Sequence, residues 1–172
     1  MFDLKKLEAI NAEYIRAMSP GDFAQALTPW LDRQPWGSTV DPDQLLKVAP
    51  LVQERTKVLS EAPRQLDFFF LPSPEFDEDA WGKIMGTQEA PLILNSAKNA
   101  LAKAEWDGEV LHETLRSIGE EYGMKLGKAQ APVRVAITGR AVGPPLFESM
   151  QVLGRETVIE RITVAQQKLE EQ

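Results

Sequence analysis

The residues best suited to chemistry lie in the stretch 124–140, which carries four basic side chains and no acidic one. They are Lys125, Lys128, Arg134 and Arg140. Arg134 is the only charge in an otherwise apolar run, and arginine presents a planar fork of donors that lysine does not. The chain as a whole has a net charge of −7. A local basic strip on an acidic protein favours selective contact with a few phosphates or bases over wrapping of a duplex.

Few residues are candidates for catalysis or metal binding. The chain has no cysteine and one histidine, His112, so a disulfide framework, a thiolate nucleophile and a histidine-rich metal site are excluded. Acidic residues gather at 75–79, but beside prolines we expect a solvated charge run rather than a metal site. Glycine-rich phosphate loops are absent. The sequence therefore predicts no catalytic and no metal-binding residue.

Length and composition are those of a globular protein. A chain of 172 residues with 43% hydrophobic residues can form one domain or two small ones, each with a core. No apolar run is long enough to cross a membrane, and the N-terminus has no apolar signal region. We therefore expect a cytoplasmic protein without a membrane partner. The net negative charge also argues against a general DNA binder.

Apolar residues recur at helical spacing through the first part of the chain. Residues 3–17 predict an amphipathic helix with a stripe of Leu4, Leu7, Ile10, Tyr14 and Ile15. Ser19-Pro20-Gly21-Asp22 predicts the start of a second helix, and Asp41-Pro42 the start of a third. Pro50 is expected to break or kink that third helix. The apolar run 66–71 is interpreted as a short buried helix, although periodicity alone also allows a strand.

Helical spacing continues at about 90–104 and 108–122. The segment 132–162 then predicts three short helical elements, separated by Gly139, by Gly143-Pro144-Pro145 and by Gly154. In the last of them Val158, Ile159 and Ile162 should point inward, with Arg155, Glu156, Glu160 and Arg161 outside. No strand-like alternation is sustained. We predict an all-α fold of two small helical subdomains, 1–71 and 90–172, with a linker over 72–89 that contains a short helix.

Several motifs follow one another in a defined order. PVRVAITG, GPPL and LGRETVIERI occur within 132–162, and Phe2 to Leu7 is followed by Ile10-Asn11 and Tyr14-Ile15 at the start. Together they resemble the last third of bacterial glutamyl-tRNA synthetase, a class I aminoacyl-tRNA synthetase. The HIGH and KMSKS signatures of the catalytic part are absent. The resemblance implies a helical-cage anticodon-binding fold that recognises the anticodon stem-loop of tRNA-Glu and is not itself catalytic.

The resemblance implies three site residues around the Gly-Pro-Pro turn. Arg134 matches an arginine that contacts an anticodon base; the alternative is a surface arginine in a salt bridge. Leu146 matches a residue that packs on a base near the first anticodon position; the alternative is a core leucine. Gly143 matches a turn residue whose backbone can hydrogen-bond a base. Here Pro144-Pro145 departs from the family's usual proline and glycine, which stiffens the turn.

Further contacts are expected elsewhere. In the resemblance an arginine near Arg55 and Lys57 distinguishes cytosine from guanine at the third anticodon position; Arg55 is the candidate, and a solvated helix face is the alternative. Lys125, Lys128 and Arg140 are candidates for phosphate contact. The partners implied are the tRNA and the synthetase's own catalytic domain. No cofactor is expected in this chain, whereas the full-length enzyme would use ATP and Mg²⁺.

Two alternatives remain open from the sequence. One is the same role in another class I synthetase, above all the class I lysyl type. The other is a helical protein–protein adaptor without RNA binding, which the net charge of −7 would also suit. Salt-dependent binding to a tRNA separates the adaptor from both synthetase readings, because only phosphate contacts release counterions.

Overall fold

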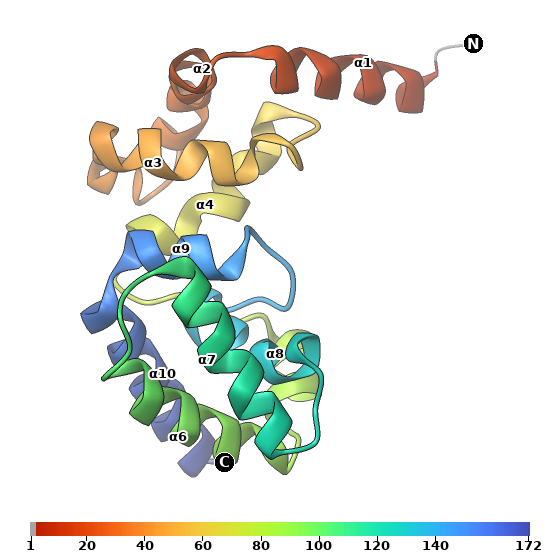
Figure 1. Ribbon diagram of the computed structural model, residues 1–172. Coiled ribbons are helices and arrows are strands. Elements are labelled where there is room, and N and C mark those ends of the chain that lie inside the picture. Colours follow the sequence, from red (N-terminus) through yellow and green to blue (C-terminus); the bar gives the residue numbers. More distant parts are fainter. Residues whose placement is uncertain (1–2) are drawn as a thin grey trace. The chain divides into compact units, whose positions relative to one another are not determined.

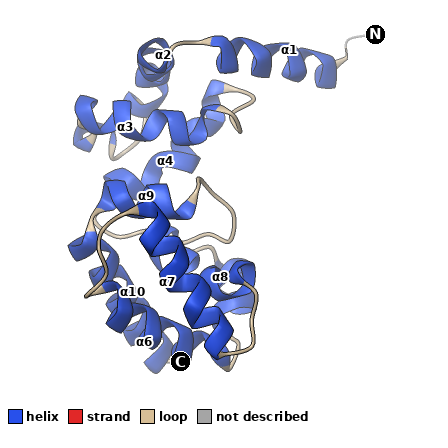
Figure 2. Ribbon diagram, in the orientation of Figure 1, coloured by secondary structure: helices blue, strands red, loops and turns tan. Residues whose placement is uncertain are grey.

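The computed structural model describes residues 3–172 and consists of helices joined by short connections (Figures 1 and 2). Phe2, part of the N-terminal motif, lies outside the described residues. No strand occurs within residues 3–172, so the predicted all-α fold is confirmed. Across the same residues no helix is both long and apolar enough to span a membrane. By their contacts the residues form two compact units, unit 1 up to Pro72 and unit 2 from Ser73 to Gln172.

Unit 1 is built from four α-helices and two 3₁₀ turns. They are α1 (Leu4–Ala17), α2 (Pro20–Asp32), η1 (Gly37–Thr39), α3 (Pro42–Gln53), η2 (Leu59–Glu61) and α4 (Ala62–Phe70). The predicted starts of α2 and α3 are confirmed. Ser19 Oγ accepts from the Asp22 N–H at 3.2 Å, and the Asp41 carboxylate accepts from the Asp43 N–H at 3.3 Å. Apolar residues of α2, α3 and α4 form the core, with Phe23, Leu27 and Phe68 among the fully buried side chains.

Pro50 is predicted to break or kink α3, and the structure shows that it does not break the helix. The helix continues through it to Gln53. Proline in a helix interior removes one backbone hydrogen bond, and packing on either side has to compensate for that loss. Val48, Ala49 and Val52 are fully buried around Pro50, while Pro50 itself is exposed. The buried face therefore keeps the helix intact.

The helix predicted at 3–17 is present, but most of its apolar stripe is exposed. Ala12 and Ile15 are the buried residues of α1, and Leu4, Leu7, Ile10 and Tyr14 remain at the surface. The C-terminal end of α1 is attached to α3 by Gln53, whose side-chain amide donates to the carbonyls of Ile15 (2.8 Å) and Met18 (2.9 Å).

Unit 2 contains the remaining helices. They are α5 (Glu78–Ala80), η3 (Trp81–Met85, a π-helical turn), α6 (Glu89–Leu101), α7 (Gly108–Glu121), α8 (Leu126–Thr138), α9 (Leu146–Leu153) and α10 (Arg155–Glu170). Helices α6, α7, α8 and α10 pack on one another around an apolar core (Figure 1). In the segment 72–89, where a linker is predicted, Trp81 and Met85 contribute side chains to that core. α5 and η3 therefore belong to unit 2 and pack on its core.

Arg161 is buried, although the sequence predicts it to face solvent. Only 4% of the residue is exposed, and its Nη1 donates to the carbonyl of Ile137 at 2.8 Å. Arg161 lies three residues after Val158 and four before Ala165, so it shares their buried face. The last carbonyls of a helix have no partner within it, and Arg161 supplies one to the end of α8.

Candidate nucleic-acid interface

Helix α8 carries Arg134, ends four residues later at Thr138 and is followed by a left-handed glycine. Gly139 has φ +81°, and its N–H donates to the Val135 carbonyl at 2.8 Å. This is the glycine closure that the sequence predicts at the end of an apolar helical run. The Thr138 hydroxyl donates to the Arg134 carbonyl at 2.8 Å and accepts from the Arg140 N–H at 3.2 Å. The residues that end α8 therefore fix the start of the following loop.

Gly139 also lies directly against the backbone of another segment. A Cβ atom at this position would lie 1.9 Å from the carbonyl oxygen of Glu75. The Asp77 N–H donates to the Gly139 carbonyl at 2.8 Å. A side chain at position 139 would not fit in this contact. The start of the loop after α8 is therefore fixed by its backbone contact with the segment that precedes α5.

Arg134 holds the other end of this loop. Its Nη1 donates to the carbonyl of Pro144 at 2.7 Å, across ten residues of chain. The next carbonyl, that of Pro145, accepts from the Ser149 hydroxyl at 2.7 Å at the start of α9. Arg134 is partly exposed. It is therefore a half-buried residue that orders the turn.

The structure brings Arg134 and Gly143 together. A Cβ built on Gly143 would lie 3.5 Å from Arg134 Nη1, an ordinary contact distance. Gly143 does not have a positive φ. The backbone of the turn therefore lies beside the arginine without requiring glycine at position 143.

Leu146 faces away from this surface. It is 2% exposed and belongs to the apolar core of unit 2. Its neighbour Phe147 is half-buried and lies edge-on to the exposed His112 ring, with the ring centroids 5.1 Å apart. The exposed apolar side chain of the loop is Val142. In this conformation Leu146 supports the turn from the core, and a base could reach it only if the turn moved.

The basic strip is spread along α8 rather than gathered at one point. Lys125 is the exposed N-cap residue, and Lys128 lies exposed in the first turn, which has no acidic residue. Arg140 follows the opposite end of the helix and is half-buried. A 13-residue helix is about 20 Å long. The two lysines therefore form one basic end of α8, and Arg134 with Arg140 forms the other.

Arg55 lies in unit 1, directly after α3. Its side chain is exposed, and its N–H donates to the Val52 carbonyl at 3.2 Å. The adjacent Thr56 is fully buried, and its hydroxyl donates to the same carbonyl at 2.8 Å. Lys57 is exposed. The turn is thus fixed by the core of unit 1 and leaves the two basic side chains at the surface.

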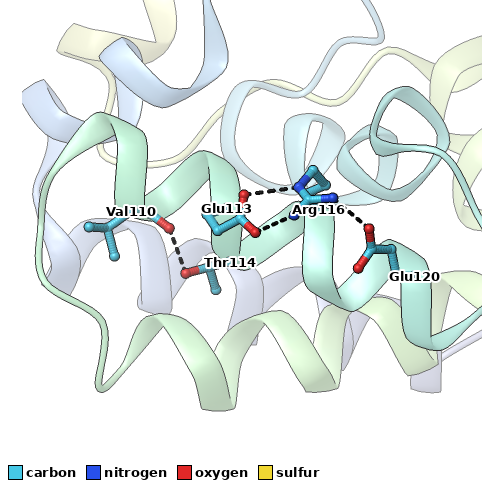
Figure 3. Close-up of polar contacts among 5 residues, drawn as sticks. All are labelled: Val110, Glu113, Thr114, Arg116 and Glu120. Atoms are coloured by element: carbon cyan, nitrogen blue, oxygen red, sulfur yellow. Dashed lines mark hydrogen bonds and ion pairs between the residues drawn. The ribbon is translucent and has the colours of Figure 1, made fainter.

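A network of exposed charges lies on α7 (Figure 3). Arg116 pairs with Glu113 and Glu120, each at 2.5 Å, and the Thr114 hydroxyl donates to the Val110 carbonyl at 2.7 Å. The hydrogen bond from Arg116 lowers the pKa of Glu113 and raises that of Arg116. Both groups are solvent-exposed, so this network contributes little to stability. Within residues 3–172 no cluster of three or more His, Cys, Asp and Glu side chains could hold a metal ion.

Comparison with known proteins places these features in a family. Residues 22–166 match the model of an anticodon-binding domain. Glutamate–tRNA ligases from Frankia casuarinae and Streptomyces coelicolor are each 47% identical over 98% of this chain, which spans 36% and 35% of their lengths. The crystal structure of a glutamate–tRNA ligase from Elizabethkingia meningosepticum, in complex with its amino acid, is similar with a TM-score of 0.78 and 25% identity. That similarity covers 98% of this chain and 33% of the other.

Proposed function

The chain belongs to the anticodon-binding domains of glutamate–tRNA ligases, and on this premise we propose that it selects tRNA-Glu by contacting the anticodon stem-loop. It spans about a third of the length of these relatives, so the reaction of the whole enzyme is part of the proposal. In that enzyme ATP and Mg²⁺ would serve a catalytic portion outside this chain. The chain's own role is binding, in the cytoplasm, without a DNA or membrane partner.

The observation that carries the proposal is the placement of Arg134. Anticodon bases are single-stranded and can be splayed out, so their Watson–Crick edges are open to a planar donor fork. Arg134 Nη1 donates to the Pro144 carbonyl, which fixes the guanidinium beside the turn. An arginine that is already held in place loses less conformational entropy when a base binds. We therefore assign a base contact to Arg134 and a backbone contact to Gly143, with Leu146 supporting the turn beneath them.

Arg55 is the proposed reader of the third anticodon base. Glutamate and glutamine anticodons differ there, C against G. Cytosine offers acceptors at O2 and N3, whereas guanine has donors on the same edge. An arginine that meets guanine would leave donors unpaired, at a cost of about 1–3 kcal/mol. The exposure of Arg55 on an ordered turn supports this assignment.

Lys125 and Lys128 are proposed to contact backbone phosphates, with Arg140 as a third contact at the other end of α8. Two exposed lysines in a first turn without an acidic residue add to the positive end of the helix dipole. Such contacts position the RNA without reading its sequence.

The first experiment is binding of the chain to tRNA-Glu anticodon stem-loops, comparing wild type with Arg134→Ala at two salt concentrations. We expect Arg134→Ala to weaken binding by about 1–3 kcal/mol, or roughly 5- to 150-fold, because a base contact is lost. Wild-type binding should also weaken as salt rises. Fluorescence anisotropy with a labelled stem-loop gives both quantities.

Arg116→Ala is the matched control, because it removes an exposed arginine of unit 2 that pairs with Glu113 and Glu120 within α7. It should bind like wild type. A stem-loop with G at the third position should bind wild type more weakly than the stem-loop with C does. Arg55→Ala should bind the two stem-loops equally. Equal binding by Arg134→Ala and wild type would contradict the base contact. Wild-type affinity that does not depend on salt would favour a protein–protein adaptor. Between the two synthetase types, the relatives favour the glutamyl over the class I lysyl type.

A further inference from the structure

The turn that carries Arg55 lies between α3 and η2 and is held by contacts to two helices. Its first half is tied to α3, because the N–H groups of Arg55 and Thr56 both donate to the Val52 carbonyl, at 3.2 and 3.0 Å. The Thr56 hydroxyl donates to the same carbonyl at 2.8 Å. Thr56 is fully buried, whereas Arg55 and Lys57 on either side of it are exposed. The core of unit 1 therefore fixes the turn as far as residue 56.

The second half of the turn is held by α1. The Asn11 side-chain amide donates to the Lys57 carbonyl at 2.8 Å, across 46 residues of chain. Asn11 is half-buried, and Ile15, one helical turn further on, is packed into unit 1. Gln53, the last residue of α3, donates to the Ile15 carbonyl at 2.8 Å and so attaches α1 to α3 just before the turn. Asn11 therefore links an anchored helix to the far side of the turn (Figure 1).

A fixed turn matters because arginine can also bind guanine. Guanine presents two acceptors, O6 and N7, on its Hoogsteen edge, and the arginine fork pairs with both. If Arg55 could shift freely, it could leave the Watson–Crick edge of G for these acceptors, and the penalty against G would be lost. Selection of C therefore requires a backbone that restricts the reach of the side chain. The contact from Asn11 supplies this restriction at Lys57.

We propose that Asn11 is a positioning residue for the choice of the third anticodon base. By holding the Lys57 carbonyl, it keeps Arg55 in the geometry that accepts C and rejects G. This inference rests on the proposed function, in which Arg55 reads that base. Asn11 acts through the turn and does not itself contact RNA. Its removal should therefore change the selectivity for the base and leave the salt dependence of binding unchanged.

The test compares binding of the C and G stem-loops, by fluorescence anisotropy, to the 172-residue chain and to Asn11→Ala and Gln44→Ala. Gln44 is the matched control, because it is also half-buried and its side-chain amide donates to a carbonyl of unit 1, that of Phe69, at 3.3 Å. We expect Asn11→Ala to reduce the preference for C over G by about 3- to 10-fold, the equivalent of one hydrogen bond. Gln44→Ala should lower the Tm to a similar extent and keep the wild-type preference. An unchanged preference in Asn11→Ala would overturn the proposal.

Arg55→Ala separates the positioning role from the reading role. In that background Asn11→Ala should have no effect on the preference, because both residues act on the same choice. A remaining effect would refute the positioning role. If Arg55→Ala keeps the wild-type preference for C, Arg55 is not the reader and both proposals fail. If Arg55→Ala loses the preference while Asn11→Ala keeps it, the positioning role alone fails.

Trypsin examines the turn without RNA. The enzyme cleaves after arginine and lysine, and Arg55 and Lys57 are both exposed. Cleavage requires local opening, so its rate reports how firmly the turn is held. We expect cleavage after residues 55 and 57, identified by mass spectrometry, to be about 5-fold faster in Asn11→Ala than in wild type, because one hydrogen bond is lost. Gln44→Ala should be cleaved there at the wild-type rate. Equal rates in the two variants would contradict the proposal even if stem-loop binding were too weak to measure.

Discussion

At the scale of single residues, Gly139 combines two demands on one position. Its φ of +81° is costly for any residue with a side chain, and a Cβ would meet the Glu75 carbonyl oxygen at 1.9 Å. We expect Gly139→Ala to destabilise unit 2 by at least about 2 kcal/mol, which lowers its Tm by about 10 °C. Thermal unfolding followed by circular dichroism measures the change.

Gly127→Ala is the control for this prediction. Gly127 lies in the same helix with nothing within 4 Å of its Cβ position and without a positive φ. Alanine there should be neutral or slightly stabilising, because it favours the helix. A small change in Tm for Gly139→Ala would mean that the segment around Glu75 shifts to make room for the added Cβ atom.

Arg116 illustrates a contact that should matter little. Its hydrogen bond lowers the pKa of Glu113 below the ordinary value of a glutamate. A lowered carboxyl pKa adds stability that is present above the unfolded value and is lost as pH falls through the folded value. Since both groups are exposed, Arg116→Ala should shift the Tm at pH 7 by less than about 2 °C. A larger shift, measured by calorimetry at pH 7 and pH 3, would show that the network is coupled to the core.

At the scale of elements, α8 separates two kinds of contact along its length. Lys125 and Lys128 lie at one end, and Arg134 faces the turn at the other. Lys128→Ala should weaken stem-loop binding uniformly across sequences and reduce the salt slope by about 1. It should leave the preference for the anticodon bases unchanged. Lys103→Ala, an exposed lysine just after α6, serves as the control. A change in base preference would contradict a phosphate role for Lys128.

Helices and their ends were predictable because they depend on local chemistry. Helix boundaries are marked by the capping side chains of Ser19 and Asp41 and by the positive φ of Gly139 and Gly154. Burial was less predictable, since it depends on distant partners. Arg161 is buried because the end of α8 needs a donor, and the stripe of α1 is exposed because unit 1 covers only its other side.

The candidate site was predictable to a similar degree. Arg134 and Gly143 could be proposed from the motif, and the structure places them in contact. The hydrogen bond from Arg134 to Pro144 and the approach of Glu75 to Gly139 could not be proposed. Both depend on where the chain returns after a loop. The core position of Leu146 was one of two alternatives that periodicity alone could not separate.

At the scale of the whole molecule, each unit has apolar packing of its own. The core of unit 2 runs from Ala80 to Ala165 and draws on η3 and on α6 to α10. We therefore expect a protein of residues 73–172 to fold alone, because it has an apolar core of its own. Circular dichroism should show a helical spectrum and a single cooperative melt. A non-cooperative melt would show that unit 1 contributes to this core.

The last residue of unit 2 lies against its first helical turns. Gln172 accepts a hydrogen bond from Trp81 Nε1 at 3.2 Å, and Lys168 lies over the Trp81 and Phe76 rings at 5.0 and 5.5 Å. The two ends of this unit are therefore neighbours in space, as they must be for circular permutation. A short peptide could join residue 172 to residue 73, and new ends could be opened at exposed positions between α6 and α7. The order in which the helices are synthesised would change while their packing stayed the same.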